Sequence, residues 1–272
     1  MLPSPYLYPS FLLTLALPLS LSLSLSHKPA RTMPPTNPPD NASPHPDGRT
    51  FTPSRASAAL VEEAGGEKGL LALTTSFYEK AFLDVNVSKF VRDPSEPHAV
   101  RFSKWICEKL GAGTPWTEER RTRVHVHQNI GGMKHAVYDR SSAHFAAWHS
   151  PKRPKEEYGR HFNLGDCRAW MRLHFWAMRE VGLWEKSPLF CDFYVRFIAH
   201  FVRVYEGSAP PFAREAARWS DPEHGGVESI ARYIAGGRRM TDVLDISLDR
   251  ALAQIPSSEA HDAEWPYINE AE

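Results

Sequence analysis

Cysteine is scarce in this chain of 272 residues. There are three cysteines, Cys107, Cys167 and Cys191, and no two of them form a CxxC pair. Three thiols cannot all pair with one another, so the sequence predicts neither a disulfide framework nor a zinc-thiolate site. A reducing compartment is the simpler interpretation.

The chain also lacks an excess of either charge. Lys and Arg together number 32, and Asp and Glu together number 32, so the formal net charge is zero. Because nucleic acids and anionic membranes recruit proteins through an excess of basic residues, we expect neither as the main partner. A hydrophobic content of 42% and an aromatic content of 11% predict a soluble globular protein with one sizeable core and added tails.

Common signatures of nucleotide binding and hydrolysis are missing. The patterns GxxxxGK, GxSxG and GxGxxG do not occur in the sequence. Their absence argues against a phosphate-binding loop, an α/β-hydrolase nucleophile and a dinucleotide-binding fold.

The first part of the chain differs in composition from the rest. Residues 11–25 form an apolar run with no Lys or Arg before it, too short and Ser-rich for a membrane span. Met33 opens a segment rich in Pro, Asn and Asp, which cannot support a packed core. A secretory signal, an organelle-targeting leader and an upstream extension all fit, so we predict residues 1–56 to be a leader or disordered segment. We expect no stable membrane insertion of the mature protein, and the cytoplasm or an organelle rather than the secretory route.

Apolar residues recur at helical spacing from residue 57 onward. Gly65 and Gly66 interrupt the stripe and predict two helices within residues 57–82, while Pro97 begins a helix that Gly111 ends as a C-cap. Residues 112–165 are irregular and predict a long loop with one short helix, and Asp166 is expected as an N-cap. Further helices are expected over residues 140–149, 166–182, 189–205, 226–236 and 240–254. The sequence therefore predicts an all-α fold.

Four segments resemble parts of a truncated haemoglobin, in particular of its second group. LTTSFYEKAFLDVNVSKFVRD, beginning at Leu73, is similar to the B helix and CD turn of that family, and HAVRFSKWICEKLGAG, beginning at His98, is similar to its E helix. HSP at residues 149–151 resembles the start of the proximal motif, and CRAWMRLHFWAMREVGL, beginning at Cys167, resembles the following helix. The resemblance covers roughly residues 68–205 and requires insertions on both sides of His149.

The resemblance implies a globin-like helical sandwich with one haem b in residues 57–220, followed by a C-terminal helical extension and acidic tail in residues 221–272. It implies His149 as the proximal iron ligand, since globins hold the iron through a neutral imidazole. His144 and then His161 stay open as alternatives. The resemblance assigns hydrogen bonding above the iron to Tyr78, His98 and Trp170. It assigns packing on the porphyrin to Phe90 and Phe102.

The implied function is binding of O2 or another diatomic ligand such as NO or CO. Several polar groups around bound O2 would retain it firmly, which suits NO dioxygenation, peroxidase-like chemistry or redox and oxygen sensing better than transport. A reductase is then a possible partner.

Two other classes of function remain open. One is a globin-shaped helical interaction module without haem. The other is a non-haem metal oxidase that uses some of the 13 histidines. His125 and His127, in the alternating sequence VHVHQ, could also supply half of a zinc or copper site.

Overall fold

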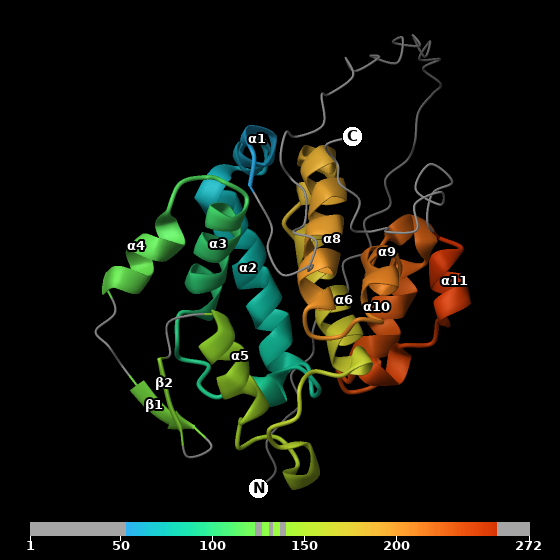
Figure 1. Ribbon diagram of the computed structural model, residues 1–272. Helices are drawn as coiled ribbons and strands as arrows, with labels where there is room; N and C mark the ends of the chain where they lie inside the picture. The colour runs from blue at the N-terminus through green and yellow to red at the C-terminus, as the bar shows by residue number, and fades with distance from the viewer. Residues whose placement is uncertain (1–52, 123–126, 131–132, 137–139, 255–272) are drawn as a thin grey trace, which may run out of the picture. The chain divides into compact units, whose positions relative to one another are not determined.

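Eleven α-helices, several single 3-10 turns and one two-stranded hairpin account for the regular structure of residues 53–122, 127–130, 133–136 and 140–254, which are the residues that the computed structural model describes (Figure 1). All of these residues belong to one unit spanning residues 37–272. The prediction of an all-α fold is confirmed. No helix among the described residues is both long enough and apolar enough to cross a bilayer.

The first two helices meet at a glycine. α1 covers Arg55–Glu63 and α2 covers Gly66–Leu83. Gly65 has a φ of 91°, a left-handed conformation that glycine adopts without a steric penalty, so the chain turns sharply there. The predicted break between two helices is confirmed.

The E-helix-like segment forms α3, His98–Lys109, directly after Pro97. Leu110 is its C-cap, and Gly111 follows with a φ of 89°. The segment between α2 and α3 contains one 3-10 turn, η1, Ser88–Phe90.

The irregular region holds more structure than its sequence predicts. α4, Pro115–Thr122, was expected to be loop, and it is followed by the antiparallel strands β1, His127–Ile130, and β2, Met133–Ala136. The expected short helix is present as α5, Arg140–Trp148, and the 3-10 turn η2 covers Lys155–Glu157. For residues 127–130, 133–136 and 140–142 only the backbone is described.

Two central helices are buried on nearly every side. α6, Leu164–Glu180, begins at the N-cap Asn163, so the prediction that Asp166 is the N-cap was wrong. Asp166 instead completes a capping box, because its carboxylate accepts from the Asn163 N–H while Asn163 accepts from the Asp166 N–H. After the short helix α7, Leu183–Lys186, comes α8, Pro188–Arg203. Both helices bury most of their residues and pack against α9, and on α6 the buried residues include the charged side chains Asp166, Arg168 and Arg172.

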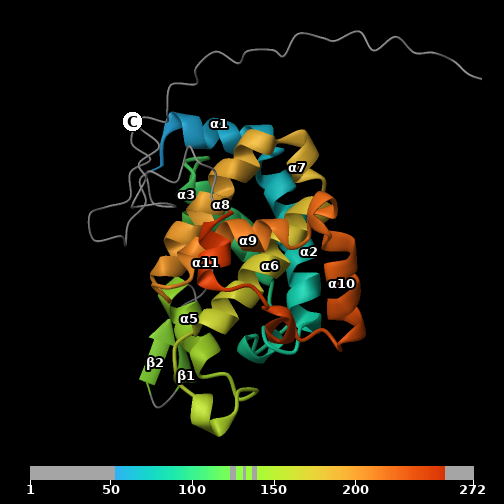
Figure 2. The same ribbon diagram turned by 90° about the vertical axis from the view of Figure 1, so that its right-hand side faces the viewer.

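The C-terminal part is a set of short elements on the far side of α6 and α8 from α3 (Figures 1 and 2). The predicted helix over residues 240–254 was wrong, because η5 and α11 are separate and Ser247 caps α11. In chain order, the elements are η3 (Pro210–Phe212), α9 (Ala213–Arg218), η4 (Pro222–His224), α10 (Gly226–Ala235), η5 (Met240–Val243) and α11 (Leu248–Leu252).

The C-terminal elements are joined to α6 through buried ions. Arg172 is 1% exposed and pairs with Glu215 of α9, and its guanidinium also donates to the Val243 carbonyl at 2.5 Å. Arg168 lies 3.7 Å from the same carboxylate. Burying a charge is unfavourable unless it is paired and hydrogen-bonded. Arg172 and Glu215 pair with each other, while the Nε atoms of Arg168 and Arg172 have no hydrogen-bond partner among the described residues. The other face of α6 packs against α2.

Candidate functional site

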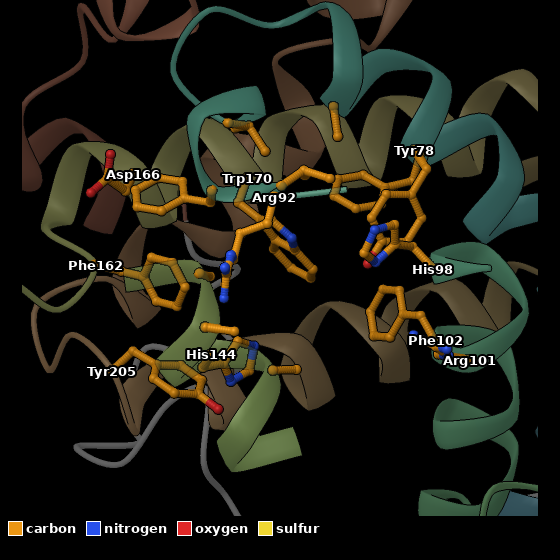
Figure 3. Close-up of a pocket in the computed structure, with 18 of the residues that line it drawn as sticks. Tyr78, Arg92, His98, Arg101, Phe102, His144, Phe162, Asp166, Trp170 and Tyr205 are labelled. Atoms are coloured by element: carbon orange, nitrogen blue, oxygen red, sulfur yellow. The ribbon is translucent and has the colours of Figure 1, made fainter. Parts of the chain in front are cut away.

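A cavity of about 510 Å³ lies among α2, α3, α5, α6 and α8 (Figure 3). Its volume is within the range of about 300–1,000 Å³ that small-molecule and cofactor sites occupy. Its walls are mostly aromatic and aliphatic, with a few polar groups at separate positions. Five of the six residues predicted to bind a cofactor line this cavity; they are Tyr78, Phe90, His98, Phe102 and Trp170.

Tyr78 and Trp170 bring two hydrogen-bond donors to the cavity. Tyr78 comes from α2 and Trp170 from α6, and the ring of Phe77 contacts both, at centroid distances of 5.0 and 5.3 Å. Within the described part of the chain, neither the Tyr78 hydroxyl nor the Trp170 indole N–H has a hydrogen-bond partner. Burial raises the pKa of Tyr78, so its hydroxyl keeps its proton and remains a donor. Both side chains line the cavity, so the two donors are available to an acceptor inside it.

His98 is anchored at the rim of the cavity. Its Nε2 lies 2.7 Å from the Asp93 carbonyl oxygen, and because a carbonyl only accepts, Nε2 carries the proton that it donates. Its ring stacks on Tyr78 at 5.3 Å between centroids. His98 is therefore held as a wall of the cavity, and in the neutral ring its Nδ1 is an acceptor.

Phe90 and Phe102 form apolar walls at different places. Phe90, at the end of η1, meets Phe162 edge-on at 4.9 Å, and the Arg153 guanidinium lies 4.8 Å from the Phe90 ring centroid. Phe102 of α3 packs against Trp170 at 6.0 Å between centroids. Either ring could pack against a flat ligand.

Arg153 also ties together the two ends of the loop that follows α5. This side chain is 6% exposed, and its guanidinium donates to the Trp148 carbonyl at 2.9 Å and to the Arg160 carbonyl at 2.6 Å. The Gly159 N–H donates to the same Trp148 carbonyl at 2.9 Å. The loop therefore begins and ends at one place beside the cavity.

His149, predicted as the proximal ligand, does not line the cavity. It follows the last residue of α5, its Nδ1 donates to the Phe145 carbonyl at 2.9 Å, and its ring stacks on Phe145 at 4.1 Å. Tyr158 meets the other side of the ring at 5.1 Å, and Gly159 approaches it closely. Because Pro151 follows so soon, the helix ends before His149, which turns into this aromatic contact instead of the cavity.

His144 is the imidazole of α5 that lines the cavity. Its ring packs edge-on against Tyr205 at 4.6 Å and against Phe162 at 5.5 Å, so two aromatic residues from different elements fix its position. Figure 3 shows His144 on the opposite side of the cavity from Tyr78 and His98. His161, the third candidate from the sequence, stacks on Trp148 at 4.0 Å and does not line the cavity.

Other residues of the cavity were not predicted from the sequence. Cys167 precedes Trp170 by three residues on α6, and that spacing could have placed both on one face. Burial raises the pKa of Cys167 to about 12, so it remains a thiol. The cavity also receives Arg92, Phe162, Asp166 and Tyr205 (Figure 3). The loop residues among them carry no periodic signal in the sequence.

His174 forms the layer behind Trp170. Its ring is fully buried and stacks on the Trp170 indole at 4.7 Å with an interplanar angle of 10°. Its Nε2 lies 3.0 Å from the Tyr194 hydroxyl, and burial lowers the pKa of His174 to about 3. A neutral His174 therefore fixes the plane of the indole from behind.

A metal site built from protein ligands alone has no candidate in the described residues. No group of three or more His, Cys, Asp or Glu side chains lies close enough there to hold an ion. His125 lies outside the described residues, and of His127 only the backbone is described. The predicted half-site for zinc or copper thus has no described side chain.

The chemistry of the cavity follows from its two opposite sides. His144 offers an imidazole on one side and Tyr78 a hydroxyl on the opposite side, and the indole of Trp170 also lines the cavity (Figure 3). An imidazole is a ligand for a metal centre, and donors stabilise a ligand that gains negative charge. Comparison with protein-family models, with curated proteins and with solved structures finds no match to this chain, so the interpretation of the site depends on this geometry.

Proposed function

We propose that this protein binds one haem b in the cavity and uses its iron to bind O2 or another diatomic ligand, as a globin-like protein of the truncated-haemoglobin type. The observation that carries the proposal is the position of His144 across one aromatic cavity from the Tyr78 hydroxyl, with the indole of Trp170 also lining that cavity.

The residues present fit the group. Haem needs an axial imidazole, apolar contacts for its two faces, and a cavity that excludes most water. His144 would supply the imidazole for the iron in place of His149, because His144 lines the cavity and His149 does not. Phe90 and Phe102 would contact the porphyrin.

Tyr78 and Trp170 would act on the bound gas. Haem would supply the iron that binds the diatomic molecule, and the protein would supply the polar groups around it. The Tyr78 hydroxyl and the Trp170 N–H would each donate to it without breaking a bond inside the protein. Hydrogen bonds to a charged acceptor contribute about 1.5–3 kcal/mol, so the complex would dissociate slowly. Slow release favours NO dioxygenation, peroxidase-like chemistry or sensing over transport, with a reductase to return the iron to its ferrous state.

The test is an absorption titration of the full chain with haemin, followed by reduction under CO. His144→Ala and His149→Ala form a matched pair, since each removes one imidazole, from the middle of α5 and from the residue directly after it. We expect a stoichiometric Soret band in the wild type and in His149→Ala, and loss of the ferrous–CO spectrum of a histidine-ligated haem in His144→Ala.

The other outcomes identify the competing functions. A wild-type protein that stays colourless with haemin would contradict the proposal and favour a helical interaction module. Tightly bound iron without porphyrin would favour a non-haem metal oxidase. Loss of the band in His149→Ala alone would return the axial role to His149.

A further inference from the structure

One buried carboxylate, that of Asp84, joins the C-terminal segment to the segment that follows α2. Asp84 is fully buried and accepts four hydrogen bonds. Its Oδ1 accepts from the N–H groups of Asn86 and Val87, each at 2.8 Å. Its Oδ2 accepts from the Tyr233 hydroxyl and the Met240 N–H, each at 3.0 Å. One carboxylate therefore serves two segments that are far apart in sequence.

Neighbouring contacts join the same two segments. The Asn86 side-chain oxygen accepts from the Thr241 N–H at 3.1 Å and from the Thr241 hydroxyl at 2.9 Å. The Val85 N–H donates to the Arg238 carbonyl at 2.9 Å. With Asp84, these bonds fix three consecutive residues after α2 to α10, η5 and the turn between them.

The segment held in this way becomes a wall of the cavity. Val87, Phe90, Val91, Arg92 and Asp93 all line the cavity. Between the end of α2 and the start of α3 the backbone has only η1 as regular structure. A segment with so few backbone hydrogen bonds of its own depends on outside contacts for its conformation. The bonds at residues 84–87 hold one end of this segment, and the Lys152 ammonium holds the other by donating to the Val91 carbonyl at 2.7 Å.

The partner of Asp84 is itself rigidly packed. Tyr233 of α10 is 1% exposed, and its ring meets Trp176 and Trp219 edge-on at 6.1 and 5.9 Å. Trp176 lies on α6, so the position of the Tyr233 hydroxyl is set by the core of the protein. Tyr233 therefore transmits the position of α6 to the segment after α2.

We propose that Asp84 is a positioning residue through which the C-terminal segment 226–243 sets the shape of the cavity and the rate at which bound molecules leave it. The part that concerns bound haem and gas depends on the proposed function. The part that concerns the conformation of residues 84–93 does not. The C-terminal extension is thus a working part of the site.

Asp84→Asn is the most informative variant, because an Asn amide cannot accept all the hydrogen bonds that the Asp84 carboxylate accepts. An Asn side chain has one oxygen and one NH2 group, whereas all four groups around Asp84 now donate. If the NH2 group faces the C-terminal segment, the Tyr233 hydroxyl can rotate to accept, but the Met240 N–H cannot. One buried N–H then loses its partner. Tyr233→Phe removes a single hydroxyl and is the milder variant.

Tyr194→Phe is the matched control. Tyr194 is also fully buried and also makes one side-chain hydrogen bond, to His174, but it lies on α8. A general loss of stability would appear in the control and in Tyr233→Phe alike. A specific effect on residues 84–93 would appear only in Tyr233→Phe and Asp84→Asn.

The first measurement is amide hydrogen exchange of the haem-free full chain. We expect exchange of residues 85–93 to be faster by about tenfold in Asp84→Asn, with a smaller increase in Tyr233→Phe and none in Tyr194→Phe, since one lost hydrogen bond is worth about one decade in the opening equilibrium. Unchanged exchange of residues 85–93 in both Asp84→Asn and Tyr233→Phe would overturn the proposal.

The second measurement uses the haem-loaded full chain. We expect faster transfer of haemin to an excess of a haem-free acceptor protein and a shifted C–O stretching frequency of the CO complex in Asp84→Asn and Tyr233→Phe. Neither is expected in Ser187→Ala, the control for this measurement, because the buried Ser187 hydroxyl donates to the Glu63 carbonyl and neither residue lines the cavity. If exchange increases while haemin loss and the CO band stay unchanged, the link to the site is wrong. If the wild type binds no haemin, the proposed function fails, and the exchange result still decides the role of Asp84.

Discussion

Polar side chains on the two sides of α6 have different surroundings. On the side of the C-terminal elements, the buried guanidinium of Arg172 meets Glu215 and the Val243 carbonyl. On the side of the cavity, the Trp170 N–H and the facing Tyr78 hydroxyl have no partner among the described residues. Charges on the first side join α6 to α9, whereas the donors on the second side face the cavity, where a ligand can reach them.

The largest effect is expected on the stabilised side. Glu215→Ala leaves Arg168 and Arg172 buried without their carboxylate. Breaking a buried ion pair by removing one partner costs about 3–5 kcal/mol, so we expect a loss of that size in the free energy of unfolding, measured by urea denaturation. A loss below 1 kcal/mol would show that water or another group already compensates these charges.

Tyr78→Phe tests the cavity side and is expected to leave stability nearly unchanged, because its hydroxyl has no partner to lose. In the haem-loaded protein, we expect the O2 dissociation rate to rise by about tenfold to a hundredfold, which corresponds to about 1.5–3 kcal/mol. Stopped-flow displacement of O2 by CO measures this rate. An unchanged rate would remove the physical basis for Tyr78 as a donor.

The pH dependence of stability reports on His174, which lies behind Trp170. Its pKa is about 3 in the fold and 6.5 without burial, so the unfolded chain takes up a proton that the folded chain refuses. Stability should therefore fall as pH decreases from about 6.5 towards 3, with a contribution from this residue of at most about 1.4 kcal/mol per pH unit. Urea midpoints of the wild type and of His174→Phe at several pH values measure it. Equal slopes would contradict a neutral buried His174.

The smallest expected effect on stability comes from comparing two hydroxyl groups on the same helix, α2. Thr74 lies one turn before Tyr78 on α2, and its hydroxyl donates to the Ala99 carbonyl of α3 at 2.9 Å. Thr74→Val should lower the free energy of unfolding by about 0.5–1.5 kcal/mol, whereas Tyr78→Phe should not. Thermal or urea unfolding of both variants makes the comparison. If both lose the same stability, the Tyr78 hydroxyl has a partner in solution.

The sequence predicted those parts of the fold and the site that depend on local spacing. Tyr78, Phe102 and Trp170 lie on amphipathic helices, where the residues to either side determine the face that each one joins. α4 was missed although its start carried signals, with Thr114 and Pro115 ahead of Glu118, whose carboxylate the Thr114 hydroxyl contacts. Because the residues of this helix are mostly polar, its sequence resembles that of a loop.

The remaining features depend on contacts that sequence order does not reveal. His144 and His149 are five residues apart, and only the point at which α5 ends decides which of them faces the cavity. The bonds from Tyr233 and Met240 to Asp84 span 149 and 156 residues. No periodicity or motif carries information over that distance, so neither the extension's contact with the cavity wall nor its anchor could be predicted.

Arg153 holds the two ends of the loop after α5 together, so the middle of the loop can vary in length while its ends keep their positions. Its two ends meet at the Trp148 carbonyl, where the Arg153 guanidinium and the Gly159 N–H both donate. Residues 154–156 are exposed, so insertions there would lengthen the loop, whereas Glu157 pairs with Lys89 of η1 and has to keep its place. This segment is consequently the natural place to graft a peptide or a fluorophore that reports on the cavity beside it.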